Sequence, residues 1–360
     1  MRKINNKIVS ILCASYNHEK FMNSFINSVL RQTNPNWELI IVDDCSTDNN
    51  ISEIQKFKDE RIKLIKHPFN MGINCGINTG FAASSGQYIA FCASDDMLMP
   101  DYVDNVFRCF EQNPDKSIIY NDLQVMDNND IPFKGKIIRT ANMNRFDVLR
   151  KMFFDGNCVN SPGIAVRREL FVTQIPLDIP MSQYQDYKEH VTLLLKSDFM
   201  IMDKISVLYR KNDSQSGISA INEITTRREH LEENLLMDSF LKIDNVKLLQ
   251  NIFKNDLDEF GKISTNVIPF VLGMLAMKSH NKYKKIWGYN QICAFINNID
   301  NYVLVNKLYG FSYKDFLGLA KKFDTDPEKI KYKKYKKLFN ILLGVCCVLA
   351  IVIIALLMAI

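Results

Sequence analysis

Two pairs of adjacent aspartates are the residues of this sequence whose type and spacing most directly suggest chemistry. Asp43-Asp44 and Asp95-Asp96 each follow an apolar, β-branched run. Adjacent acids can simply cap a helix. Two such pairs also suit a site for a divalent cation and a diphosphate, because carboxylates bind Mg²⁺ or Mn²⁺ and the cation neutralises a diphosphate leaving group. One acid of a pair would then bind the metal while the other accepts a hydrogen bond from a ribose hydroxyl.

The elements that position these acids follow from the hydrophobic periodicity. Short apolar runs predict strands, and apolar residues at helical spacing predict the helices between them. The predicted strands cover residues 8–14, 37–42, 62–65 and 88–92, and the first helices cover 19–32 and a segment ending near 57. This alternation predicts right-handed crossovers and a parallel sheet. Both acid pairs then follow the carboxyl ends of strands, where open parallel sheets bind ligands.

Beyond residue 100 the alternation is less regular. The spacing predicts helices over 102–112, near 146–154 and over 186–196, two short strands in 117–125, and a strand pair in 199–210. Residues 226–323 are helical in pattern, and we interpret them as a helical extension.

Three runs carry a resemblance to a known family. Residues 9–17 (VSILCASYN), 41–48 (IVDDCSTD) and 93–96 (ASDD) resemble, in order and spacing, the opening motifs of glycosyltransferase family 2, whose enzymes have the GT-A fold. The resemblance implies that Tyr16 packs against a nucleobase and that Asp44 accepts a hydrogen bond from it. It also implies that Asp95 contacts the ribose and that Asp96 holds Mg²⁺ or Mn²⁺ against the diphosphate. A UDP-sugar is the favoured donor, because a carboxylate partner suits the ring N–H of uracil.

A stretch rich in asparagine and glycine extends the resemblance. The family's repeated Asn-x-Gly pattern is matched by Asn70, Gly72, Asn78 and Gly80. Many members carry Arg directly before the second Asn, where this chain has Ile77, so a phosphate or base contact is missing or made elsewhere. Turn geometry accounts for the glycines. Asn78, with Ala14 of the first motif, completes the nucleotide-sugar-binding residues that the resemblance implies.

The resemblance also implies a catalytic base. Inversion at an anomeric carbon needs a carboxylate that removes the proton of the attacking hydroxyl, and the family places it in a Glu-Asp pair that opens a helix. Asp186 matches the base, whereas Gln185 stands where Glu is usual. Glu189 is the runner-up, and His190 is interpreted as a packing residue. Asp186 could instead be a first-turn acid that the helix dipole favours.

Two further segments resemble the family more weakly. Residues 160–168 resemble its acceptor-side stretch, and 208–212 with 216–219 resemble a closing strand and a flexible loop over the donor. The predicted organisation is a nucleotide-sugar-binding half (1–100), an acceptor-side half (101–222), a helical extension (223–328), a polybasic juxtamembrane run (329–337) and a transmembrane anchor (338–360).

The composition is that of a globular protein. Of 360 residues, 47% are hydrophobic and 24% are charged, and the net charge is +5. Basic residues concentrate in 329–337 rather than among aromatics over a face, which argues against a nucleic-acid partner. The nine cysteines show no zinc-ligand spacing and lie mostly in apolar runs, which indicates a reducing compartment.

The end of the chain predicts a membrane association. Residues 338–360 contain no charged side chain over 23 positions, and as a helix they would rise about 35 Å, enough to cross a hydrocarbon layer of about 30 Å. The lysines just before them predict a cytoplasmic catalytic part, a contact with the anionic inner leaflet, and a single-pass anchor in the inner membrane.

The expected fold is a GT-A, Rossmann-like, mixed but mainly parallel sheet flanked by helices, with a helical extension and a C-terminal transmembrane helix. The expected function is inverting, metal-assisted transfer from a UDP-sugar to a hydroxyl of a lipid-linked or surface-glycan acceptor. Two alternatives stay open. One is a catalytically inactive GT-A scaffold that binds partners, and the other is a nucleotidyltransferase, although the loop 15–19 lacks the glycines and basic residues that a triphosphate would favour.

Overall fold

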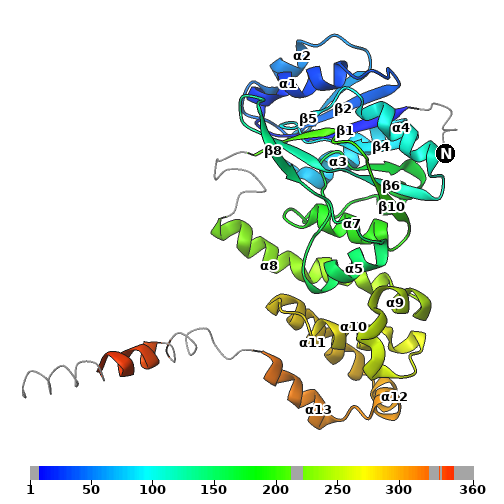
Figure 1. The fold of residues 1–360 in the computed structure, drawn as a ribbon, viewed down its shortest axis with the longest axis vertical. Helices are drawn as coiled ribbons and strands as arrows, with labels where there is room; N and C mark the ends of the chain where they lie inside the picture. Colours follow the sequence, from blue (N-terminus) through cyan, green and yellow to red (C-terminus); the bar gives the residue numbers. More distant parts are fainter. Residues whose placement is uncertain (1–7, 212–221, 324–331, 333–334, 344–360) are drawn as a thin grey trace, which may run out of the picture. The chain divides into compact units, whose positions relative to one another are not determined.

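The computed structural model describes residues 8–211, 222–323, 332 and 335–343 of the chain. The chain divides into two compact units, residues 1–301 and 302–360. The first unit contains both β-sheets and the helices as far as α11 (Figure 1).

A seven-stranded mixed sheet forms the centre of the first unit. Its order is β10-β6-β9-β4-β1-β2-β3, and β9 alone runs antiparallel to its neighbours, β4 and β6. The strands are β1 Val9–Ser15, β2 Trp37–Asp43, β3 Ile62–Lys66, β4 Tyr88–Phe91, β6 Lys116–Tyr120, β9 Ala165–Arg167 and β10 Asp198–Ile201. The chain runs outward from β1 to β3 and then returns to β4 on the other side of β1. The loops after β1 and β4 therefore diverge, which is where such sheets bind ligands.

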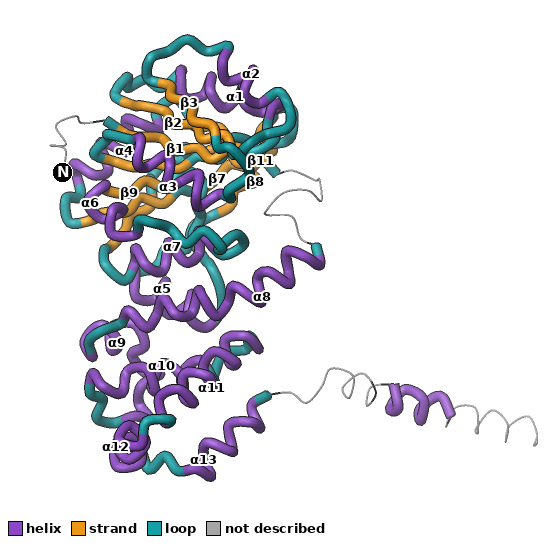
Figure 2. Tube along the Cα trace, turned by 180° about the vertical axis from the view of Figure 1, so that it is seen from behind, coloured by secondary structure: helices purple, strands orange, loops and turns teal. Residues whose placement is uncertain are grey.

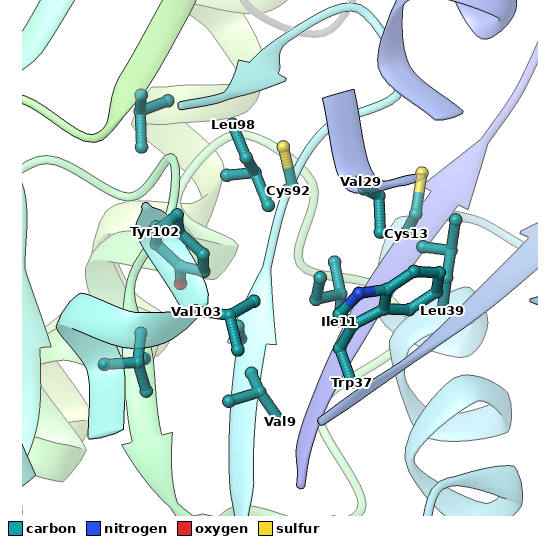
Figure 3. Packing of buried hydrophobic residues seen from close by; sticks show 14 of the residues in the cluster. Val9, Ile11, Cys13, Val29, Trp37, Leu39, Cys92, Leu98, Tyr102 and Val103 are labelled. Atoms are coloured by element: carbon teal, nitrogen blue, oxygen red, sulfur yellow. The ribbon is translucent and has the colours of Figure 1, made fainter. Parts of the chain in front are cut away.

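Four helices follow the early strands and cover the sheet. They are α1 Glu19–Leu30, α2 Asn50–Gln55, α3 Ile73–Ala83 and α4 Tyr102–Gln112. Every residue of β2 is buried, as expected of a central strand with helices on both faces. Figure 3 shows one layer of this core, in which Ile11 and Cys13 of β1 lie near Leu39 of β2 and Val29 of α1. Alternate strand residues share a face, which explains why the odd-numbered residues of β1 gather in this layer.

A second, four-stranded sheet has the order β5-β11-β7-β8. Its strands are β5 Met97–Leu98, β7 Leu123–Met126, β8 Pro132–Ile138 and β11 Val207–Arg210. β11 is antiparallel to β5 and parallel to β7. Because β5 comes directly after the Asp95-Asp96 loop, this pairing brings the end of β11 to the acid pair.

The later helices other than α6 form the lower part of the first unit in Figures 1 and 2. Helices α5 Arg145–Phe154, α6 Arg168–Phe171 and α7 Gln185–Leu194 precede α8 Glu223–Met237, α9 Val246–Phe253, α10 Ile268–Ala276 and α11 Lys282–Ile296. Both views place α7 next to the large sheet and α5 and α8 beyond it. The ring of Phe153 on α5 lies 4.9 Å from that of Phe253 and 5.0 Å from that of Phe240. The extension therefore shares an aromatic core with α5. Two further helices, α12 Ile299–Tyr309 and α13 Tyr313–Gly318, follow.

The secondary structure predicted for the first hundred residues is confirmed, since each predicted strand and helix has a counterpart within a few residues. Later strands were harder to predict. β5, β8 and β9 have no predicted counterpart, and the predicted strand pair in 199–210 is two strands, β10 and β11, that lie in different sheets. The mixed α/β sheet flanked by helices is confirmed.

The prediction of a C-terminal transmembrane helix, and with it of a single-pass anchor in the inner membrane, is wrong. None of the helices formed by the described residues is long and apolar enough to cross a membrane. The described part of the predicted span is 338–343, and six helical residues rise only about 9 Å against a hydrocarbon layer of about 30 Å. Residues 344–360, most of the polybasic run 329–337, and the predicted flexible loop 216–219 lie outside the described residues.

Candidate active site

The two acids after β2 make different contacts. The buried carboxylate of Asp43 accepts hydrogen bonds from the backbone N–H of Ser46 at 3.0 Å and from the side-chain amide of Asn50 at 2.7 Å. The same amide group also donates to the Ser15 hydroxyl at the end of β1, at 3.0 Å. Asp43 therefore fixes the conformation of its own loop and ties it to β1.

Asp44, the predicted acceptor for a nucleobase, is 5% exposed and connects β2 to the loop that leads into α3. Its Oδ1 accepts a hydrogen bond from the backbone N–H of Met71 and lies 2.7 Å from Nδ1 of His67, and its Oδ2 accepts from the N–H of Gly72 at 2.8 Å. A carboxylate has about four lone-pair positions, so one position on Oδ2 remains for a further donor.

Tyr16, the predicted stacking partner of the base, is 43% exposed directly after β1. The next residue, Asn17, has a φ of 55°. Its N–H donates to Oγ of Ser46 at 3.0 Å, and its Oδ1 accepts from the N–H of Thr47 at 2.8 Å. These bonds between the loops after β1 and β2 hold the backbone that presents the Tyr16 ring.

Ala14, another predicted donor-site residue, lies against α3. A Cβ added at Gly76 would lie 2.9 Å from the Ala14 Cβ, closer than two such atoms pack. Both positions therefore need small residues, because α3 approaches the end of β1 this closely.

The Asp95-Asp96 pair is joined to the second sheet by Arg210. The backbone N–H of Arg210 donates to Oδ1 of the buried Asp96 at 2.8 Å, and its Nε donates to the carbonyl of Asp95 at 2.7 Å. The guanidinium also bonds the Asp127 carbonyl at 2.6 Å and the Asp130 carboxylate. Burial, followed by the charge of Asp95, raises the pKa of Asp96 well above its usual range, although Arg210 opposes the rise. Asp96 therefore holds β11, while Asp95 is the more accessible acid.

A divalent cation fits this pair. Among the described residues the Asp95 carboxylate accepts no hydrogen bond, and it lies close enough to Asp96 to raise the pKa of that acid. No cluster of three or more His, Cys, Asp or Glu side chains suited to a metal occurs in the part of the chain that the structure describes. Mg²⁺ typically uses one or two carboxylates together with substrate phosphates rather than a cage of protein ligands. One accessible carboxylate beside a second, buried acid matches that preference.

Asn78, the remaining predicted donor-site residue, is bonded to a distant loop. Its Nδ2 donates to the Leu177 carbonyl at 3.0 Å, and its Oδ1 accepts from the Leu177 N–H at 2.7 Å. One helical turn earlier, Asn74 donates to the Asp178 carbonyl at 2.7 Å. The two asparagines of α3 therefore hold the segment that precedes α7, and the donor contact predicted for Asn78 remains a prediction.

Asp186, the predicted base, lies in the first turn of α7 at the end of a hydrogen-bond chain. The Ser161 hydroxyl donates to its Oδ2 at 2.6 Å, and Nε2 of His190 lies 2.8 Å from the same hydroxyl oxygen. On the other side of the imidazole, Nδ1 lies 3.2 Å from the Tyr120 hydroxyl. Since the one Ser161 proton points to Asp186, His190 donates from Nε2 to Ser161 and accepts from Tyr120 at Nδ1.

Burial shifts the pKa values of two titratable neighbours of Asp186. It lowers the pKa of His190 to about 4, against a smaller opposing effect of the Asp186 charge, so the imidazole is neutral near pH 7. Burial and the charge of Asp186 raise the pKa of Glu189 to about 8. Glu189 is thus mostly protonated near neutral pH, which makes it a poorer base than a carboxylate that stays ionised. His190 is buried, as a packing residue would be, but it also bonds on both sides.

The charges of Asp95, Asp96 and Asp186 all act on one side chain, that of Tyr209 in β11. Burial is the main reason that the pKa of Tyr209 is raised, and the charges of Asp96, Asp95 and Asp186 each add to the rise. The structure therefore brings the acid pair after β4 and the first turn of α7 within electrostatic reach of the same phenol.

Several residues that shape this site were missed from the sequence. His67 follows β3 directly, so the rule that selected Asp44, a polar side chain at the carboxyl end of a strand, could also have selected it. Ser161 lies in the predicted acceptor-side stretch but has no local signal for its bond to Asp186. Arg210 ends the predicted closing strand, and only the strand pairing shows that it bonds both acids.

Comparison with known proteins defines the class. Residues 10–173 match the model of glycosyl transferase family 2. The protein is therefore a glycosyltransferase, as the curated relatives also indicate.

Two curated relatives have names that state a substrate or a pathway. The chain is 29% identical over 214 residues to the Escherichia coli UDP-Glc:alpha-D-GlcNAc-diphosphoundecaprenol beta-1,3-glucosyltransferase WfgD, covering 59% of this chain and 80% of that protein. It is 38% identical over 96 residues to the putative teichuronic acid biosynthesis glycosyltransferase TuaG of Bacillus subtilis, covering 26% of this chain and 38% of TuaG.

A solved structure shows the same fold. Staphylococcus aureus TarS 1–349, determined with UDP, superposes with a TM-score of 0.54 at 17% identity over 85% of this chain and 93% of that one. The same protein in complex with UDP-GlcNAc gives a TM-score of 0.51. The likeness shows a shared fold that extends beyond the family-matched residues.

Proposed function

We propose that the protein transfers a sugar from a UDP-sugar to a hydroxyl of a lipid-linked surface-glycan precursor, with inversion at the anomeric carbon and with Asp186 as the base. The observation that carries this proposal is the setting of Asp186. Its carboxylate opens α7 within electrostatic reach of the same tyrosine as Asp95 and Asp96, and a serine hydroxyl orients one of its oxygens.

The donor binds at the diverging loops after β1, β2 and β4. The exposed Tyr16 ring stacks on uracil, and the free position on Asp44 Oδ2 accepts the ring N–H. Such stacking contributes about 1–3 kcal/mol per base. The UDP bound by TarS and the UDP-glucose in the name of WfgD support a uridine nucleotide.

The acid pair after β4 serves the diphosphate and the ribose. The sequence assigned the metal to Asp96 and the ribose to Asp95. Because the Asp95 carboxylate is the more accessible, we assign Mg²⁺ or Mn²⁺ to Asp95 instead, with Asp96 holding Arg210 and β11 in place behind it. When bound, the cation neutralises charge that develops on the departing diphosphate.

The chemistry is a single displacement. The acceptor oxygen forms a bond to the anomeric carbon while the bond from that carbon to the β-phosphate oxygen of UDP breaks. The proton of the acceptor hydroxyl passes to a carboxylate oxygen of Asp186. The Ser161 hydroxyl donates to Oδ2, and the backbone N–H of Tyr187 donates to Oδ1 at 2.7 Å, which leaves one direction on each oxygen to face the acceptor.

The acceptor class rests on the relatives. WfgD is named for a GlcNAc-diphosphoundecaprenol acceptor and TuaG for teichuronic acid biosynthesis, so a sugar carried on a polyprenyl diphosphate is the acceptor to test first.

The test is a screen of nucleotide-sugars for nucleotide release by the purified full chain with Mn²⁺ and a synthetic GlcNAc-diphospholipid. We expect UDP release from one UDP-sugar, dependent on the acceptor and abolished by EDTA. Release from a dTDP- or GDP-sugar alone would overturn the donor assignment. Retention of the anomeric configuration in the product would overturn the role of Asp186.

A further inference from the structure

Glu232 of α8 makes an unusually complete set of contacts with the segment that leads into α7. Oε1 accepts hydrogen bonds from the Ser182 N–H at 3.0 Å and from the Ser182 hydroxyl at 2.9 Å. Oε2 accepts from the N–H groups of Gln183 and Tyr184, each at 2.8 Å. The residue is only 6% exposed. A buried carboxylate is costly unless it is fully hydrogen-bonded, and these four donors meet that requirement.

These contacts lie directly before the first turn of α7. The N-cap residue Tyr184 makes no side-chain cap bond among the described residues, although helix amino ends normally receive one from Ser, Thr, Asp or Asn. The negative charge of Glu232 instead comes from another helix, and it lies against three consecutive N–H groups at the positive end of the α7 dipole. Asp186 lies two residues beyond the last of these groups.

The same segment is held at its other end by α3. Asn78 bonds both backbone groups of Leu177, and Asn74 bonds the Asp178 carbonyl. Lys188 of α7 adds an ion pair to the Asp178 carboxylate at 2.5 Å. Residues 177–184 are therefore fixed between a helix of the nucleotide-binding sheet and a helix of the extension.

The position of Glu232 on α8 is itself held by the contacts of the next residue. The next residue, Glu233, is 2% exposed and accepts a hydrogen bond from the Asn281 amide at 3.0 Å. The buried Nζ of Lys284 lies 3.9 Å from Glu233 and donates to the Met152 carbonyl of α5 at 2.7 Å. These contacts anchor α8 to α11 and α5, so the Glu232 carboxylate has little freedom to follow the segment if the segment moves.

We propose that Glu232 is a positioning residue for glycosyl transfer: from the helical extension, it sets the conformation of residues 182–184 and thereby the place of the Asp186 carboxylate relative to the acceptor. This inference rests on the proposed role of Asp186 as base. It assigns the extension a task in the reaction, which is to complete the acceptor side of the site. Since a shift of about 1 Å in a reacting group can cost about 10²-fold in rate, a contact that does not touch substrate can still control turnover.

The experiment compares Glu232→Gln with Glu223→Gln in the full chain. The amide nitrogen that replaces one carboxylate oxygen cannot accept from an N–H group, so at least one of the backbone bonds is lost, and two are lost if it takes the place of Oε2. Glu223, on the same helix, has a side chain that is 78% exposed and pairs with the exposed Arg227, so its variant is the matched control. Two readouts are needed, namely amide hydrogen exchange by segment and steady-state kinetics with donor and acceptor varied separately.

For Glu232→Gln we expect exchange in residues 182–187 to accelerate by about tenfold or more, while residues 9–15 and 37–43 stay protected as in the wild type. We expect kcat to fall by about 10–10²-fold, with the KM for the donor and the Kd for UDP unchanged. Glu223→Gln should match the wild type in both readouts.

The exchange readout does not depend on activity, so it separates the two proposals. Local loss of protection without loss of kcat would overturn the positioning role, and so would unchanged protection. A failure of the wild type to transfer any sugar would overturn the proposed function instead. If Glu232→Gln does not fold, Glu232→Asp is the second variant, since it keeps the charge but is one methylene too short to reach all four donors. Wild-type kcat and protection in that variant would also overturn the positioning role.

Discussion

The proposed donor side and the proposed acceptor side of this site are built in different ways. On the donor side, Asp43, Asp44 and Asn17 bond backbone groups of the loops that follow neighbouring strands of one parallel sheet. On the acceptor side, Asp186 depends on Ser161, on His190, and on a segment that α3 and α8 hold from opposite ends. The proposed donor site is a local property of a strand–helix repeat, whereas the proposed base is positioned by parts of the chain that only the complete fold brings together.

The largest effect should come from the base itself. Asp186→Asn keeps the size of the side chain but removes its ability to accept a proton, so kcat should fall by about 10²–10⁴-fold. UDP affinity, measured by calorimetry, should stay within about twofold of the wild type, because the donor loops are untouched. Asp115→Asn, at an exposed position, is the control. An Asp186→Asn variant with wild-type turnover would place the base elsewhere and would reopen Glu189.

The two acids after β4 should differ in what their substitution changes. Asp95→Ala should abolish Mn²⁺-dependent turnover with little change in the free energy of unfolding, because among the described residues its carboxylate accepts no hydrogen bond. Asp96→Ala should also lower the free energy of unfolding, by about 1–3 kcal/mol, because the Arg210 N–H would lose its buried partner. Denaturant unfolding beside metal-dependent kinetics measures both. Equal destabilisation by the two variants would contradict this division of roles.

Tyr16→Ala should weaken the donor side alone. Loss of the stacking surface should raise the Kd for UDP by about tenfold, in line with the energy of aromatic–base stacking. The kcat at saturating donor should change little, because the acceptor side is independent of this loop. Tyr313→Ala removes another exposed tyrosine and serves as the control. If Tyr16→Ala lowered kcat without changing UDP affinity, the proposed separation of the two sides would fail.

The smallest effect concerns stability as a function of pH. Burial holds the pKa of His190 at about 4, below its ordinary value of 6.5. Between these values the unfolded chain binds a proton that the folded chain does not, so His190 lowers stability as the pH falls from 6.5 to 4. As the pH falls through that window, the free energy of unfolding of His190→Gln should therefore rise by about a few kcal/mol or less relative to that of the wild type.

The difference between variant and wild type is the quantity to follow in urea titrations. Glu189, whose pKa is raised to about 8 from 4.5, has the opposite slope and destabilises the fold as the pH rises between those values. Asp186 and Tyr120 are the other titratable groups that face the imidazole. His280→Gln, at an exposed position, should show no such window. A His190→Gln difference that does not change with pH would contradict a neutral, buried imidazole.

The predictive power of the sequence ended close to where its strand–helix repeat ended. The four early strands and the acids beyond them could be predicted, because apolar runs and helical spacing report local structure directly. The antiparallel strand β9 could not, because a three-residue strand has too few residues to show a period. The apolar run at the end of the chain predicted a transmembrane helix from hydrophobicity alone. That prediction was wrong, because none of the described helices is long and apolar enough to span a membrane.

Asn78 and Glu232 show the same limit within the site. The sequence selected Asn78 for its family pattern, yet the structure bonds it to Leu177, which lies 99 residues away along the chain. No sequence pattern selected Glu232. Its contacts with Ser182 span 50 residues, and its helix has no pattern that distinguishes it from the rest of the helical extension.

The sequence by itself determined the class of the protein and the positions of Asp44, Asp95, Asp96 and Asp186, because those follow from local periodicity and from motifs. Only the tertiary structure decided which of these acids are bonded to the protein and which remain open to a ligand. A hydrogen bond to a buried carboxylate depends on distance in space, and the packing of α3, α7, α8 and β11 sets those distances.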